Sequence, residues 1–292
     1  MTIEMILFLA VFAVTTVLVM LGLSRFKEER AKNTALKVFA WSCFITHISV
    51  MWQTSLTNAG SGFVDRSILW PIYFCNVIMY LLLILATMKK DTKVFKIIAT
   101  FTAYAGVIGA LVTFFDYKYP FHDDGGVYSF ERLKSTISHA LLLMGSLYLF
   151  VGGWVKIRFK NILPYTLGVL FCGFVGGLLN WFFIARGIDP DINAMWLRHT
   201  ALEGTPFTGL VMGLISIGLV ALFSLTYEFI LFTKNKKKGI RELYFLQETK
   251  DYLINFKTKL TNRRFLIQSI SILLFTIFTL TMVIILSTTY AF

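Results

Sequence analysis

Charged residues are scarce in this chain, because Asp, Glu, Lys and Arg together make up only 15% of its 292 residues. A soluble domain carries about 25% charged residues, which cover its surface in water. The hydrophobic share is 57% and the mean hydropathy is +0.71. The composition therefore excludes soluble enzymes, nucleic-acid-binding modules and disordered tails, and it indicates a polytopic membrane protein.

Cysteine is also scarce, with three residues that all fall in apolar runs: Cys43, Cys75 and Cys172. None has the C-x-x-C spacing of a zinc site, and so few cysteines do not make a disulfide framework. We expect no bound metal and no cofactor. These thiols are either inert small hydrophobes or, in one case, a reactive group.

Acidic and basic residues are missing from the middle of every long apolar run. This absence argues against a transporter that couples transport to ions or protons through carboxylates within the membrane. It leaves open an uncoupled transporter or permease for a small neutral or amphipathic solute. A structural or signalling membrane protein without chemistry is a further alternative.

Eight apolar segments are long enough to span a bilayer, which takes about 20 residues. They are residues 4–24, 36–57, 68–88, 94–115, 135–155, 162–185, 207–232 and 265–289. We therefore predict an all-α polytopic membrane bundle of about eight transmembrane helices. The chain would form a single integral membrane domain over residues 1–292.

Basic residues gather on one side of this predicted bundle. The first, third, fifth and seventh loops hold most of the 28 Lys and Arg residues. Positively charged loops stay on the cytoplasmic side, which places both termini outside. The net charge of +12 is thus explained by topology and does not indicate a nucleic-acid partner.

The seventh loop, about residues 233–264, is the longest and opens with the basic cluster 234–238. A helical stretch follows, with apolar side chains on one side: Phe245, Leu246, Tyr252, Leu253, Phe256 and Leu260. This stretch is either an interfacial amphipathic helix beside anionic lipid of the inner leaflet, or a cytoplasmic linker helix packed on the bundle.

Cys75 and His139 are predicted at similar depth beneath the outer face. At 1.5 Å per residue, Cys75 lies roughly 10 Å below Ile68, and His139 roughly 6 Å below Ser135. An imidazole within reach of a thiol can take its proton and leave a nucleophilic thiolate. Ester carbonyls of glycerolipids lie in this layer, so the pair could form an acyl-thioester. A packing cysteine and a structural histidine are the alternative.

Three short motifs resemble signature positions of the YwaF-like family of bacterial integral membrane proteins, whose animal relative is transmembrane protein 164. They are residues 70–76 (WPIYFCN), residues 137–139 (ISH) and Asn180 with the aromatic run after it. The resemblance covers residues 36–232. It implies a lipid acyltransferase of the bacterial plasma membrane, with Cys75 as the acyl-accepting nucleophile and His139 as its base. Tyr73 and Asn76 stand where the family pattern often has His and Asp.

We therefore predict a membrane-embedded enzyme that transfers or cleaves lipid acyl groups through Cys75 and His139. Asn76 or Asn180 would polarise the carbonyl. The candidate substrate-binding residues, which would hold a phospholipid or another acyl lipid, are Tyr73, Lys134, Ser138, Arg198 and His199. The run His122-Asp123-Asp124 is more typical of a solvated turn than of a metal site.

Overall fold

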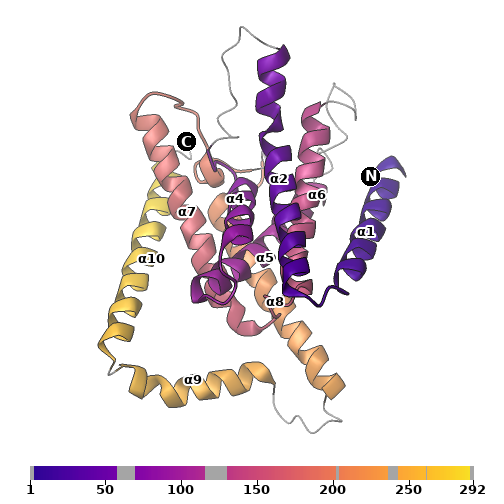
Figure 1. Ribbon diagram of the computed structural model, residues 1–292. Helices are drawn as coiled ribbons and strands as arrows, with labels where there is room; N and C mark the ends of the chain where they lie inside the picture. The colour runs from indigo at the N-terminus through magenta and orange to yellow at the C-terminus, as the bar shows by residue number, and fades with distance from the viewer. Residues whose placement is uncertain are drawn as a thin grey trace. The chain divides into compact units, whose positions relative to one another are not determined.

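The computed structural model describes residues 3–57, 70–115, 130–201, 204–235, 243–260 and 262–289. All regular elements within these ranges are helical, namely nine α-helices and two short 3₁₀-helices (Figure 1). The predicted all-α class is confirmed. Contacts divide the chain into two compact units, residues 1–156 and 157–292, each described here by itself.

The first unit is built from five α-helices: α1 (Ile3–Leu23), α2 (Glu29–Thr57), α4 (Phe74–Thr87), α5 (Lys93–Phe115) and α6 (Phe130–Val151). Apolar side chains of α2, α4, α5 and α6 form its core, and the fully buried ones include Leu36, Ile78, Leu82, Ala103 and Leu142. Glycines let these helices approach closely: Gly106 faces Ser146, and Gly145 faces Leu82. Close helix approach through small residues is typical of packing in membranes.

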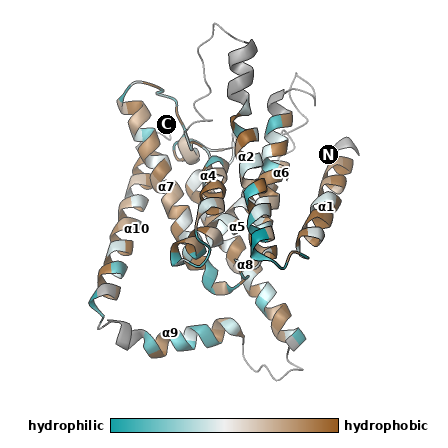
Figure 2. Cartoon of the chain, in the orientation of Figure 1, coloured by the Kyte–Doolittle hydropathy of each residue, from teal (hydrophilic) through white to brown (hydrophobic). Residues whose placement is uncertain are grey.

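The second unit contains η1 (Phe159–Asn161), α7 (Ile162–Ala185), η2 (Ala194–Trp196), α8 (Gly209–Asn235), α9 (Tyr244–Leu260) and α10 (Arg263–Thr289). Helix α10 packs along α7, where the rings of Phe174 and Phe275 lie 5.4 Å apart. Helix α9 lies across the end of α10 (Figure 1). In Figure 2, α9 carries hydrophilic patches, whereas α1 is coloured hydrophobic along most of its length.

All eight predicted apolar segments are helices in the structure, and α9 is the additional one. Six helices among the described residues are long and apolar enough to cross a membrane, namely α1, α5, α6, α7, α8 and α10. The chain is therefore a multi-pass membrane protein. Of the other two, α2 is long, at 29 residues, whereas α4 has only 14.

The predicted start of the third span, residue 68, is wrong, because α4 begins at Phe74 and residues 70–73 are not helical. Pro71 explains part of this difference, since proline biases the residue before it away from helical geometry. A helix of 14 residues rises roughly 21 Å, less than the thickness of about 30 Å of a bilayer core. Cys75 is therefore in the first turn of a short helix, not two turns below the start of a long one.

Candidate functional site

Cys75 lies in the first turn of α4, where the backbone N–H groups lack helical partners. The residue before the helix, Tyr73, is extended, and its carbonyl accepts from the N–H of Asn76 at 3.0 Å and of Val77 at 3.3 Å. The partial positive charge at the start of a helix also favours negative charge at this place.

Helix α5 forms the next wall around the half-buried Cys75 thiol. The thiol is hydrogen-bonded to the Thr113 hydroxyl, and that hydroxyl donates to the Gly109 carbonyl at 3.0 Å. A Cβ placed at Gly109 would lie 3.5 Å from the Cys75 sulfur, so the missing side chain leaves α5 close to the thiol.

His139 on α6 is held by the backbone one turn earlier. Its Nδ1 lies 2.8 Å from the Ser135 carbonyl oxygen, and the Ser138 hydroxyl donates to the same carbonyl at 2.9 Å. A carbonyl only accepts, so Nδ1 carries the proton, and in the neutral ring Nε2 keeps its lone pair. A histidine used as a base needs this kind of orientation.

Cys43 on α2 links the surroundings of these two residues. Its buried thiol donates to the carbonyl of Ser138 at 3.4 Å, and Ser138 directly precedes His139 in the chain. It is also close enough to Cys75 for the two sulfurs to interact electrostatically. Three helices of the first unit, α2, α4 and α6, thus converge around the candidate site. The sequence did not single out Cys43 for this role.

The other predicted site residues of the first unit differ in exposure. Asn76 is buried beside Cys75, whereas Tyr73 is 41% exposed at the start of α4. Lys134 is half-buried and close enough to His139 to interact with it electrostatically. The binding of lipid by Tyr73 and Lys134 stays a prediction, and Lys134 is the cation nearest His139 in sequence.

Asn180, in the second unit, is fully buried and forms two hydrogen bonds with one residue. Its side-chain oxygen accepts from the Ala194 N–H at 2.9 Å, and its amide nitrogen donates to the Ala194 carbonyl at 3.1 Å. These bonds hold η2 against α7. The polarising role predicted for Asn180 stays a prediction. In the structure, the amide of Asn180 binds the backbone of Ala194.

Arg198 and His199 belong to the same loop after α7. The Arg198 guanidinium donates at 2.7 Å to the carbonyls of Pro190 and Ile192. Asn193, which the sequence did not single out, accepts from the N–H of Arg198 and donates to the carbonyl of His199. His199 is exposed. The predicted binding of a headgroup by Arg198 and His199 stays a prediction, while their backbones and the guanidinium stabilise the loop.

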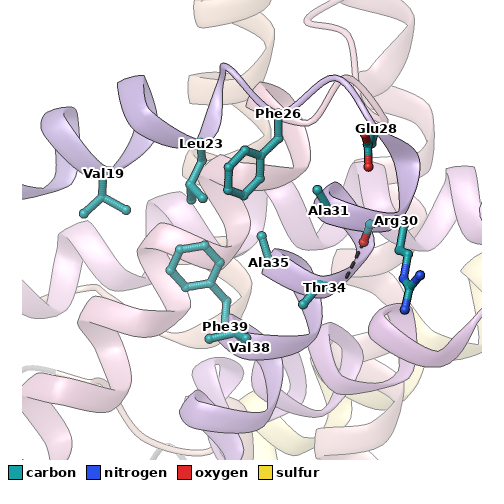
Figure 3. A pocket seen from close by; sticks show the side chains of 10 residues that line it. All are labelled: Val19, Leu23, Phe26, Glu28, Arg30, Ala31, Thr34, Ala35, Val38 and Phe39. Carbon is teal, nitrogen blue, oxygen red and sulfur yellow. Dashed lines mark hydrogen bonds between the residues drawn. The ribbon is translucent and has the colours of Figure 1, made fainter.

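A cavity of about 700 Å³ lies where α1 turns into α2 (Figure 3). Leu23, Phe26 and Phe39 gather on its apolar side, and Arg30 lies at its other end. Its lining residues include neither Cys75 nor His139, so it is separate from the candidate site.

Within the described ranges, no three His, Cys, Asp or Glu side chains form a group that could hold a metal ion. The run at residues 122–124 lies outside these ranges.

The model of the TMEM164 family matches residues 1–233, which extend from α1 into the last turn of α8. Helices α9 and α10 lie beyond the matched region. No curated protein and no solved structure matches the chain.

Proposed function

The chain belongs to the TMEM164 family, and from this membership we propose that it is a membrane-embedded enzyme that transfers or cleaves lipid acyl groups. The observation that carries the proposal is the environment of Cys75. This thiol lies in the first turn of α4, is hydrogen-bonded to Thr113, and is half-buried beside Gly109. Such a position gives an ester carbonyl a nucleophile at the end of a helix where negative charge is favoured.

The first half of the proposed reaction loads the enzyme. Burial disfavours a charged sulfur, so the thiol needs a base. Nε2 of His139 takes the S–H proton, and the Cys75 sulfur forms a bond to the carbonyl carbon of a lipid ester. The C–O bond to the glycerol oxygen then breaks, and that oxygen takes the proton back from His139. The products are an acyl-thioester on Cys75 and a lysolipid.

The second half of the proposed reaction removes the acyl group and regenerates the free Cys75 thiol. A hydroxyl group, either of water or of a second lipid, gives its proton to Nε2 and attacks the thioester carbonyl. The C–S bond breaks, and the sulfur regains a proton from His139. Water as the acceptor gives hydrolysis, and a lipid hydroxyl gives acyl transfer.

The neighbouring polar residues have proposed roles in this cycle. Asn76, which is buried beside the nucleophile, stabilises negative charge on the carbonyl oxygen, as does the first turn of α4. Lys134 attracts the lipid phosphate, and the exposed Tyr73 contacts the headgroup. Ser138 places His139 through the carbonyl of Ser135 that both share. We propose the bacterial plasma membrane as the location.

The test is an acyl-transfer assay with the purified chain in lipid nanodiscs. A phospholipid labelled on its acyl chain is supplied with and without a lysolipid acceptor, and labelled products are separated. We expect Cys75→Ala to abolish product formation and Cys172→Ala, a buried thiol on α7, to retain it. Equal product from Cys75→Ala and the unsubstituted chain would remove the proposal.

A further inference from the structure

Helix α9 has no counterpart in the matched family region and joins two candidate spans. It follows α8 and ends at Leu260, and α10 begins at Arg263. At 17 residues it is not among the six helices that could cross the membrane. A helix joined so closely to two spans stays at the membrane surface, and the basic loops place this surface on the cytoplasmic side.

The two long sides of α9 differ in polarity. Leu246 and Leu253, seven residues apart, lie on one side and are 50% and 65% exposed. Gln247, Asp251 and Asn255 follow one another at intervals of four residues on the opposite side and are also exposed. This arrangement is typical of a helix that lies in a lipid–water interface.

The first turn of α9 is fixed by a buried carboxylate from α8. Glu228 is 1% exposed, and its Oε2 accepts from the Phe245 N–H at 3.0 Å. Its Oε1 accepts from the Phe159 N–H of η1 at 2.9 Å. The first N–H groups of a helix have no partner within the helix, and a carboxylate is favourable there. One side chain therefore ties α8, η1 and α9 together.

Further contacts fix the rotation of α9 about its axis. The rings of Phe159 and Phe245 lie 4.6 Å apart, and the Arg158 guanidinium lies 3.7 Å from the centre of the Tyr244 ring. Lys160 Nζ lies 2.7 Å from an oxygen of Glu248. These contacts use the side of α9 that carries Tyr244, Phe245 and Glu248, and they leave the leucine side turned away from η1.

We propose that α9 binds the anionic lipid surface of the inner leaflet, with Leu246 and Leu253 inserted among the lipids and Glu228 fixing its rotation. Charge supports lipid as the occupant. Lys250 borders the apolar side of α9. Lys234 in the last turn of α8 and Arg263 at the start of α10 are exposed as well. Cations in this position attract acidic headgroups, while the apolar side chains enter the acyl boundary.

The test places an environment-sensitive fluorophore on one side of α9 at a time. Leu253→Cys carries it on the proposed lipid side, and Asn255→Cys is the matched control on the polar side. Both positions are exposed, so neither substitution disturbs the core. The full chain is reconstituted in phosphatidylcholine vesicles with or without phosphatidylglycerol, and the unsubstituted chain reports labelling of its native thiols.

We expect nitroxide-bearing lipids to quench the label at 253 and aqueous iodide to quench the label at 255. Phosphatidylglycerol should increase the protection of position 253 from iodide. Equal quenching of both positions by iodide would overturn the proposal. Protection of position 253 that persists in detergent and rises with protein concentration would assign this side to a second copy of the chain instead.

The role of Glu228 is tested on the same two labelled positions. In Glu228→Gln the charge is lost and an amide NH₂ replaces one acceptor, so the first turn of α9 is released. We expect the difference in quenching between the labels at positions 253 and 255 to disappear. Asp251→Asn, which removes a carboxylate from the exposed polar side of α9, should preserve that difference. An unchanged difference in Glu228→Gln would show that Glu228 does not fix the rotation.

Discussion

Nδ1 of His139 lies 2.8 Å from the carbonyl oxygen of Ser135, one turn earlier on α6. This hydrogen bond assigns the proton to Nδ1 and leaves Nε2 as the basic nitrogen of the neutral ring. A backbone carbonyl cannot titrate or rotate away as a side chain can. The proposed base is therefore held in one tautomer by the helix that carries it.

Removing the imidazole should cost activity without unfolding the chain. A general base contributes a factor of roughly 10² to 10⁴ to a rate, and we expect His139→Gly to lose product formation by about that factor. Added imidazole should restore part of the rate, because the space left in α6 can hold a free ring. A variant that elutes as a folded monodisperse species yet keeps full activity would exclude His139 as the base.

Gly109 should control access to the Cys75 sulfur. In Gly109→Ala the new Cβ lies 3.5 Å from the sulfur, an ordinary contact, so we expect this variant to fold. Alanine also favours the helical state by up to about 1 kcal/mol. The larger Gly109→Val should slow alkylation of Cys75 by a maleimide and slow acyl transfer with it. Alkylation at an unchanged rate in Gly109→Val would contradict this arrangement of α4 and α5.

Gly106 should be needed for the packing of α5 on α6. A Cβ at this position would overlap the Ser146 hydroxyl, and overpacking of this kind costs about 1–3 kcal/mol. Gly106→Ala should therefore lower the melting temperature in detergent. The double variant Gly106→Ala with Ser146→Gly should recover most of the loss, which is a coupling that only contacting residues show. Additive losses would mean that the two residues do not touch.

Asn180 should stabilise the loop after α7. Asn180→Ala leaves the buried N–H and carbonyl of Ala194 without their partner, at a cost of about 1–3 kcal/mol for each group. We expect faster hydrogen exchange across residues 190–199. Asn180→Asp keeps the acceptor and should lose less protection. If Asn180→Ala leaves exchange unchanged but abolishes acyl transfer, the residue acts on the substrate and not on the loop.

The sequence was sufficient to predict which segments are helices, because hydropathy reports the length of chain that a membrane can cover. Several predicted helix starts are wrong, because hydropathy marks only the apolar part of a helix. Helix α2 begins at Glu29, seven residues before the predicted start, and Lys32 pairs with Glu29 at 3.1 Å in its first turns. A charged extension into water is helical without being apolar, so hydropathy misses it.

The contacts that shape the sites were less predictable. Glu228 stands out in the sequence as a lone acidic residue near the end of an apolar run. Its partners could not be predicted, because they are two backbone N–H groups that lie far apart in sequence. Cys43 and Asn193 gave no such signal, because their contacts depend on how helices and loops pack. The chemistry proposed for Cys75 and His139 rests on residue type and stays a prediction, whereas the first-turn position of Cys75 required the true start of α4.

The central claim is that the Cys75 sulfur carries an acyl group during the reaction. The most direct test mixes the purified chain with an acyl-labelled phospholipid, quenches it in acid and maps the label by mass spectrometry. The account predicts an acyl adduct on the peptide that contains Cys75, removed by neutral hydroxylamine and absent from Cys75→Ala. Label that is absent from this peptide while product accumulates, or that is equally present in Cys75→Ala, would contradict it.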